Sequence, residues 1–187
     1  MKRTVDQAFS AISRREFMPP EVKELADFDH AAGIGYGQTI SQPTTVKRML
    51  NWLDVKPGQK VLDVGSGSGW TTALLAYLAG AKGRVHAVEL VPELVKFGRD
   101  NFKSTGLSNA VFHQAGKQLG WPQAAPYDRI LVSASATELP KALIDQLKPS
   151  GKLVIPINYD ILEITKEPGG STDIVTHPGY VFVPLIT

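Results

Sequence analysis

The sequence predicts an α/β protein whose mostly parallel, seven-stranded sheet carries helices on both faces and an antiparallel strand at its C-terminal end. Three observations support this fold class. Short β-branched runs alternate with longer helix-forming runs through most of the chain, as in strands joined by crossover helices. The apolar run 61–64 leads into Gly65, Gly67 and Gly69 and then into a helix-forming run, which indicates a strand, a tight turn and a helix. The last two β-rich runs are joined by the turn-rich segment 167–171, which is typical of antiparallel neighbours.

The N-terminal part of the chain is predicted to be mostly helix and loop. Apolar residues recur on one face of a helix over 4–13, which ends before two prolines. Residues 21–33 show no clear period and are expected to be irregular or briefly helical. Three glycines and a proline indicate a structured loop over 33–43. A second amphipathic helix follows over 44–53, and 56–59 is a turn.

The core elements then follow in a regular order. Helices are expected at 70–80, 92–104 and, briefly, 139–147. Strands are expected at 60–64, 84–88, 110–113, 128–133, 152–156, 159–165 and 179–185.

Length and composition indicate a single domain over 1–187. The order of the expected elements divides it into a helical and loop cap over 1–55 and an α/β core over 56–187. The formal net charge of +2 comes from scattered basic residues, which argues against nucleic acid as a partner. The sequence has no cysteine, no metal-ligand spacing among its four histidines and no apolar run of about 20 residues. We therefore expect a cytoplasmic monomer with no metal site and no membrane partner.

The glycine turn and a later acid predict a nucleoside-binding site. Glu89 ends the second core strand and stands 20 residues after Gly69, about where an acid hydrogen-bonds ribose hydroxyls in doubly wound folds. The G-x-G-x-G spacing differs from the G-x-G-x-x-G dinucleotide pattern, so a ligand without a pyrophosphate is favoured. Two alternatives remain. One, a distant one, is a dinucleotide-dependent oxidoreductase. In the other, the glycines only turn the chain and bind no ligand.

Several motifs resemble a known enzyme family. The segment from Asp63 to Gly69 is similar to motif I of class I S-adenosylmethionine-dependent methyltransferases. The loop GYGQTISQP at 35–43 and the preceding REFMP at 15–19 resemble the signature of the protein-L-isoaspartate O-methyltransferase family. Further matches follow in order, at LGWP (119–122), APYDRI (125–130), QLKPSG (146–151) and FVPL (182–185).

The resemblance implies a Rossmann-like fold, S-adenosyl-L-methionine as cofactor and a specific reaction. In this family a methyl group passes to the α-carboxylate of an isoaspartyl residue in a damaged protein, and the ester then cyclises to a succinimide. By carry-over, the motif I glycines would pass the methionine part of the cofactor and Glu89 would hold its ribose. The implied cofactor-binding residues are Gln38, Ile40, Asp63, Gly65, Ser66, Gly67, Gly69, Glu89 and Leu90. The implied catalytic residues are Thr39 and Ser41.

The chemistry asks little of these side chains. A carboxylate is ionised near pH 7 and is already a nucleophile, and a sulfonium is an activated methyl donor. Catalysis would therefore consist mostly of alignment in a pocket with little water. Ser41 would orient the carboxylate, although a hydroxyl in a loop also commonly satisfies backbone groups.

Two departures from the family pattern leave alternatives open. The run 115–120 lacks the acid that the family places near the adenine, although Gln114 or Gln118 is a substitute. The loop after Pro156 is shorter than usual, and in the family it helps to form the peptide site. A family member with a different acceptor, or a non-catalytic module with weakened cofactor binding, therefore remain alternatives.

Overall fold

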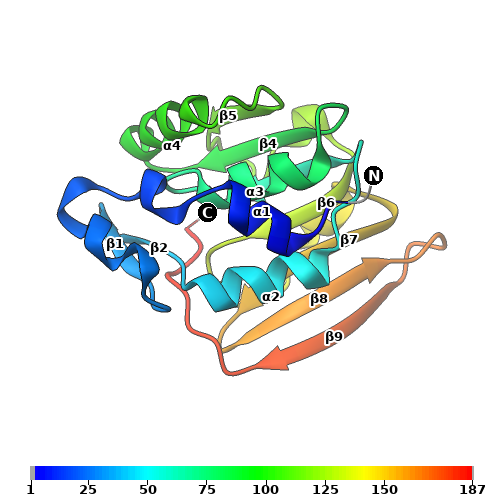
Figure 1. Cartoon of the computed structure of the whole chain (residues 1–187). Helices are drawn as coiled ribbons and strands as arrows, with labels where there is room; N and C mark the ends of the chain where they lie inside the picture. The colour runs from blue at the N-terminus through cyan, green and yellow to red at the C-terminus, as the bar shows by residue number, and fades with distance from the viewer. Residues whose placement is uncertain (1–2, 187) are drawn as a thin grey trace.

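The computed structural model describes residues 3–186 and contains a seven-stranded sheet in the order β5-β4-β3-β6-β7-β8-β9 (Figure 1). The neighbours from β5 to β7 are parallel, whereas β8 and β9 are antiparallel additions at one edge. The strands are β3 (Lys60–Val64), β4 (Arg84–Glu89), β5 (Ala110–Gln114), β6 (Tyr127–Val132), β7 (Leu147–Ile157), β8 (Asp160–Lys166) and β9 (Thr172–Pro178). The predicted fold class is confirmed.

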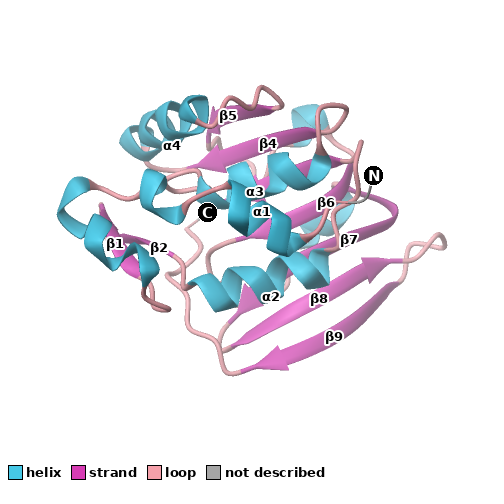
Figure 2. Cartoon of the chain, viewed as in Figure 1, coloured by secondary structure: helices cyan, strands magenta, loops and turns pink. Residues whose placement is uncertain are grey.

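Helices cover the two faces of the sheet unequally (Figure 2). One face packs against α1 (Val5–Ala11), α2 (Pro43–Leu53), α3 (Trp70–Ala79) and α4 (Pro92–Ser104). The other is covered by α5 (Lys141–Asp145) and the loop with the short 3-10 helix η3 (Pro122–Ala124). Val61 of β3 faces the first group and Leu62 the second, and both are fully buried. Burial on both faces explains why Val61, Leu62 and Val64 of β3 are all apolar rather than alternating with exposed polar residues.

The close packing of α3 and α4 depends on two glycines. Gly69 precedes α3 with φ +89°, and a Cβ there would lie 2.8 Å from the carbonyl oxygen of Gly98 in α4. A Cβ on Gly98 would lie 2.8 Å from the carbonyl oxygen of Gly67. Both contacts are shorter than a real Cβ tolerates, so α4 can lie against the glycine turn only because neither residue has a side chain.

The N-terminal cap is organised around a buried arginine. Two 3-10 helices, η1 (Arg14–Phe17) and η2 (Pro20–Asp27), precede a hairpin of β1 (Ala32–Gly35) and β2 (Gln38–Ile40). Arg14 is 6% exposed, and its guanidinium donates hydrogen bonds to the carbonyl oxygens of Leu25, Ala26, Phe28, His30 and Ile40. One side chain therefore ties η2 to the end of the hairpin.

Three expectations from the sequence need correction. The predicted last strand, 179–185, is wrong: β9 ends at Pro178, and the following segment crosses the carboxyl ends of the strands, where Pro184 bridges Ser135. The chain turns back directly after β8, so Thr172 already pairs with Lys166. The predicted loop at 33–43 contains the β1–β2 hairpin, and the predicted helix at 139–147 shrinks to α5 because Leu147 joins β7.

None of the helices within residues 3–186 has both the length and the apolar character needed to cross a bilayer. The same residues contain no group of three or more side chains arranged to hold a metal ion.

Candidate active site

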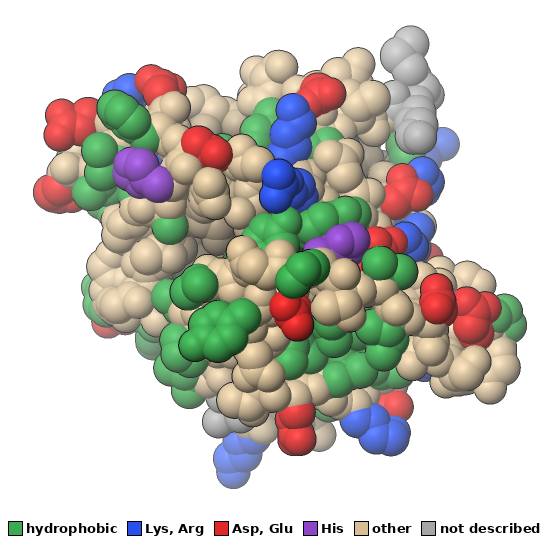
Figure 3. Space-filling view, turned by 90° about the horizontal axis from the view of Figure 1, so that it is seen from below, with side chains coloured by type: hydrophobic (Ala, Val, Ile, Leu, Met, Phe, Trp, Pro, Cys, Tyr) green, Lys and Arg blue, Asp and Glu red, His purple; other side chains and the backbone are tan. Residues whose placement is uncertain are grey.

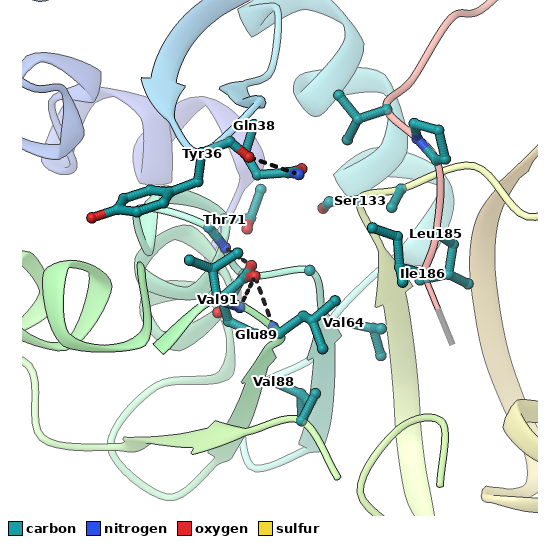
Figure 4. A pocket seen from close by; sticks show the side chains of 18 of the residues that line it. Tyr36, Gln38, Val64, Thr71, Val88, Glu89, Val91, Ser133, Leu185 and Ile186 are labelled. Carbon is teal, nitrogen blue, oxygen red and sulfur yellow. Dashed lines mark hydrogen bonds between the residues drawn. The ribbon is translucent and has the colours of Figure 1, made fainter. Parts of the chain in front are cut away.

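A pocket of about 240 Å³ opens at the carboxyl ends of β3, β4 and β6, beneath the β1–β2 hairpin. Figure 4 shows Glu89 on one side of it, Ser133 and Leu185 on another, and Gln38 reaching in from the hairpin. This is the place where open parallel sheets bind ligands, because helix starts and turns there present polar backbone groups.

The glycine turn forms the floor of the pocket. Gly65, Ser66 and Gly67 line it, whereas Gly69 does not and is instead the N-cap of α3. The N–H groups of Gly65 and Ser66 both donate to the carbonyl oxygen of Val88, which anchors the turn to β4. The buried hydroxyl of Ser66 has no hydrogen-bond partner among the described residues. The turn therefore presents an unused polar atom beside a backbone that a ligand can approach closely.

Glu89 is held in place by three backbone N–H groups. Its Oε2 accepts from Gly67 at 2.9 Å, and its Oε1 accepts from Leu90 at 2.7 Å and Val91 at 3.0 Å. The side chain is 7% exposed and lines the pocket together with Leu90. Because each carboxylate oxygen can accept more than one hydrogen bond, Glu89 can also receive a pair of hydroxyl donors from a ligand.

Asp63 lies behind the pocket wall rather than in it. The side chain is fully buried, and its Oδ2 accepts hydrogen bonds from Thr71 Oγ1 at 2.9 Å and Thr72 Oγ1 at 2.6 Å. Burial raises the pKa of Asp63 to about 6, against the opposing effect of the two threonine hydroxyls, and the charge of Glu89 raises it further. Asp63 thus joins the end of β3 to the start of α3 and supports the turn from below.

The hairpin places the other predicted residues at the pocket. Gln38, Thr39, Ile40 and Ser41 all line it. The start of α2 is capped by Asp29, whose Oδ1 accepts from the backbone N–H of Thr44 at 2.8 Å. The helix start that directly follows Ser41 is therefore capped by a residue from another segment.

Sequence reasoning missed several residues of the site. Tyr36 at the hairpin tip, Ser133 after β6 and the segment 183–186 all line the pocket, as does the run 115–120, of which only Gln118 was considered as a cofactor contact. Ser133 directly follows a buried parallel strand, so its position could have indicated it. The segment 183–186 was noted only as a family match and was placed in a strand, which hid its contribution.

The comparisons with known proteins settle the family. A family model described as "Protein-L-isoaspartate(D-aspartate) O-methyltransferase (PCMT)" matches residues 1–187. The chain belongs to this family. The resemblance drawn from the motifs is confirmed, and the dinucleotide-dependent alternative has no support.

Two curated members of the protein-L-isoaspartate O-methyltransferase family illustrate how close the likeness is. The one from Pyrococcus horikoshii is 43% identical, with 97% of this chain and 84% of that protein covered. The one from Aeropyrum pernix is 46% identical, with 98% and 73% covered.

Solved structures of the same family share the fold. A putative protein-L-isoaspartate O-methyltransferase from Plasmodium falciparum, crystallised with S-adenosyl-L-homocysteine, has a TM-score of 0.83 at 31% identity, covering 97% of this chain and 89% of that one. A second protein-L-isoaspartate O-methyltransferase has a TM-score of 0.86 at 24% identity; this chain is covered over 98% of its length but spans only 61% of that structure.

Proposed function

We propose that this chain binds S-adenosyl-L-methionine in the pocket and transfers its methyl group to the α-carboxylate of L-isoaspartyl residues in damaged proteins. One observation carries the proposal: most of the predicted cofactor residues and both predicted catalytic residues line the same pocket. The glycine turn and Glu89, which would hold a nucleoside, line the same pocket as Thr39 and Ser41 of the hairpin segment. Members of the family at over 40% identity carry the name of this activity.

The residues present fit the cofactor. Gly65, Ser66 and Gly67 would border its methionine part, with the free hydroxyl of Ser66 available to a polar group. Glu89 would accept hydrogen bonds from the two ribose hydroxyls, because its orientation is already fixed by backbone donors. Gln38, Ile40 and Leu90 would contact the cofactor from the rim, while Asp63 and Gly69 would act through the shape of the turn.

The protein's part in the reaction would be positioning. The bound sulfonium supplies an activated methyl group. Thr39 and Ser41 would donate hydrogen bonds to the acceptor carboxylate and aim one of its oxygens at the methyl carbon, so that the O–C bond forms as the C–S bond breaks. The surrounding apolar residues, among them Val64 and Leu185, would exclude water. Such a reaction needs no general base, because the carboxylate is ionised at neutral pH.

The proposed activity also implies the partners of the enzyme and its location in the cell. Isoaspartyl-containing peptides and proteins would be the acceptors, and the enzyme would act in the cytoplasm without a nucleic-acid or membrane partner. A net charge of +2 is consistent with this.

The deciding experiment is methyl transfer from labelled S-adenosyl-L-methionine to an isoaspartyl peptide and to its normal aspartyl twin. We expect label in the first peptide and background in the second. Equal labelling of the two would reject repair specificity. Calorimetry with S-adenosylhomocysteine separates the remaining cases. Binding of S-adenosylhomocysteine without methyl transfer to either peptide would indicate a different acceptor. Absence of binding would indicate a non-catalytic module.

A further inference from the structure

The sheet ends in an edge strand that little of the molecule covers. β9 pairs with β8 alone, and six of its seven residues are exposed, the partly buried exception being His177. The opposite edge strand, β5, differs because α4 packs beside it. Figure 1 shows the β8–β9 hairpin extending away from the helices at the lower side of the molecule.

Half of the backbone polar groups of β9 point away from β8. The N–H of Gly179 donates to the carbonyl oxygen of Tyr159, and Pro178 pairs with Asp160 in the next register position. Hydrogen-bonded and non-hydrogen-bonded pairs alternate in an antiparallel pair. The N–H and C=O groups of Ile174 and Thr176 therefore point outward, where an unpaired edge favours association with another strand.

The middle of β9 also exposes two large apolar side chains. Ile174 is 44% exposed and Val175 is 46% exposed, and as consecutive strand residues they lie on opposite faces. Val181 and Tyr159 nearby are 82% and 73% exposed. Figure 3, which views the molecule from below and so faces β9, shows hydrophobic side chains gathered on this side. β9 contains no lysine, the residue that most often keeps an edge strand single.

We propose that β9 pairs antiparallel with β9 of a second copy of this chain, joining the two sheets into one about a two-fold axis at Val175. In this register Val175 meets its own symmetry mate, and Ile174 meets Thr176 of the other copy. Asp173 comes opposite His177, so that an acid and a base face each other twice. The proposal replaces the expectation of a monomer.

The charge pattern favours this antiparallel arrangement over a parallel one. A parallel pairing would set the two Asp173 carboxylates side by side, which is unfavourable between neighbouring strands. His177 is already held in place: its ring stacks on Trp52 at a centroid distance of 3.7 Å, and its Nε2 lies 3.4 Å from Glu163 Oε2. An imidazole fixed in this way loses little freedom when Asp173 of the partner approaches.

The experiment is sedimentation velocity across the micromolar range. We expect a reversible dimer whose dissociation constant rises at least about tenfold in each of two variants. Val175→Lys places two lysines together at the two-fold axis, and Thr176→Pro removes an outward N–H without touching the bonds to β8. Glu93→Gln at an exposed position of α4, at the far end of the sheet, makes the same +1 change in charge as Val175→Lys and should leave dimerisation unchanged.

Cofactor binding and methyl transfer show that each variant is folded, because β9 does not line the pocket. Should either variant fail this check, Asp173→Lys at an exposed position takes its place. A chain that stays monomeric throughout the range overturns the proposal. So does a dimer that Val175→Lys and Thr176→Pro leave unchanged, since its interface would lie elsewhere.

Discussion

In the proposed reaction, the acceptor side of the site depends on Ser41. Its hydroxyl stands at the pocket just before α2, whose own start is capped by Asp29. A hydrogen bond from a neutral donor to a charged acceptor is worth about 1.5–3 kcal/mol, and at this position it would act mainly when the carboxylate is aligned.

Ser41→Ala should therefore lower kcat about tenfold to a hundredfold while leaving the Kd for S-adenosylhomocysteine nearly unchanged. Steady-state kinetics with an isoaspartyl peptide and calorimetry give the two numbers. Ser104→Ala, an exposed serine on α4, is the control. Loss of cofactor affinity with kcat preserved would move Ser41 to the cofactor side.

Gly67 tests the floor of the pocket. A Cβ there would lie 3.2 Å from Ile34 Cδ1, and φ is +50°. Gly67→Val should abolish binding of S-adenosylhomocysteine in calorimetry, because the branched side chain would fill the approach to the turn. Gly106→Val, at φ +72° in open space, carries comparable backbone strain away from the pocket and should bind normally. Normal binding by Gly67→Val would remove the turn from the cofactor site.

His86 and His113 form a pair that the proposed reaction does not use. Their Nδ1 and Nε2 atoms lie 3.0 Å apart. Burial lowers the pKa of His86 to about 4, with help from the nearby charges of His113, Arg84 and Lys60, and burial also lowers the pKa of His113. Between pH 6.5, the value of a free histidine, and about 4, the unfolded chain binds more protons than the folded one, so the free energy of unfolding should fall on acidification.

Thermal unfolding between about pH 7 and pH 5 measures this dependence. His86→Gln keeps a hydrogen-bonding group without a titrating one, so its Tm should fall less than that of the wild type. His30→Gln, an exposed histidine, should behave as the wild type. The raised pKa of Asp63 has the opposite effect on the free energy of unfolding in this range. Comparing variants separates the two effects, because every variant keeps Asp63. Equal Tm losses in wild type and His86→Gln would rule out the histidine pair.

At the scale of elements, the cap depends on Arg14. Its guanidinium satisfies carbonyl oxygens of η2 and β2 and lies 5.7 Å from the ring centroid of Trp70, the first residue of α3. Burial lowers the pKa of Arg14, with the charge of Asp29 opposing that shift, but an arginine stays protonated at neutral pH. The cap and the glycine turn are thus joined through one cation.

Arg14→Met should lower the free energy of unfolding by about 3 kcal/mol or more, because it leaves several buried carbonyl oxygens unpaired. It should also raise KM for the peptide, since the hairpin loses its anchor. Arg15→Met removes only an exposed ion pair to Asp27 at 3.5 Å and should cost less than about 1 kcal/mol. Denaturant unfolding compares the two, and similar losses would show that Arg14 does not organise the cap.

Elements with a strong local pattern were predictable, and those set by distant contacts were not. β3 and α3 follow from a buried apolar run, glycines and a helix-forming run. β9 was misplaced because Thr172–Pro178 is a polar-looking strand that exists through its register with β8. The β1–β2 hairpin was expected only as a loop, because its turn contains three consecutive residues with positive φ, Gly35, Tyr36 and Gly37. The composition of the segment indicates a loop but not the strand pairing on either side of that turn.

At the scale of the whole molecule, the pocket is built from segments spread over most of the chain. The hairpin, the turn, the ends of β4 and β6, and residues 183–186 all contribute walls. The motifs assigned Thr39, Ser41, Gly65 and Glu89 to one site, and all four line the pocket. Their individual roles stay predictions. The motifs did not place Asp63 behind the wall, because burial depends on Thr71 and Thr72 closing over it.

A ligand that touches so many segments should stabilise them together. S-adenosylhomocysteine at a hundred times its Kd should add about 2.7 kcal/mol to the free energy of unfolding. In a domain of this size that raises Tm by roughly 5–10 °C. Differential scanning calorimetry should show one transition moving as a unit. A separate early transition that the ligand leaves in place would mean that the cap unfolds independently.

The contact between Gly69 and Gly98 has a consequence for how the family's sequences would be interpreted. Gly98 lies inside a helix, away from the pocket, yet no other residue fits there against the backbone of the turn. In a saturation mutagenesis screen for activity, position 98 would therefore score as intolerant as the ligand-facing glycines. Positions 69 and 98 would also restrict each other's substitutions. A statistical search for ligand-binding residues would therefore include Gly98, although Gly98 does not line the pocket.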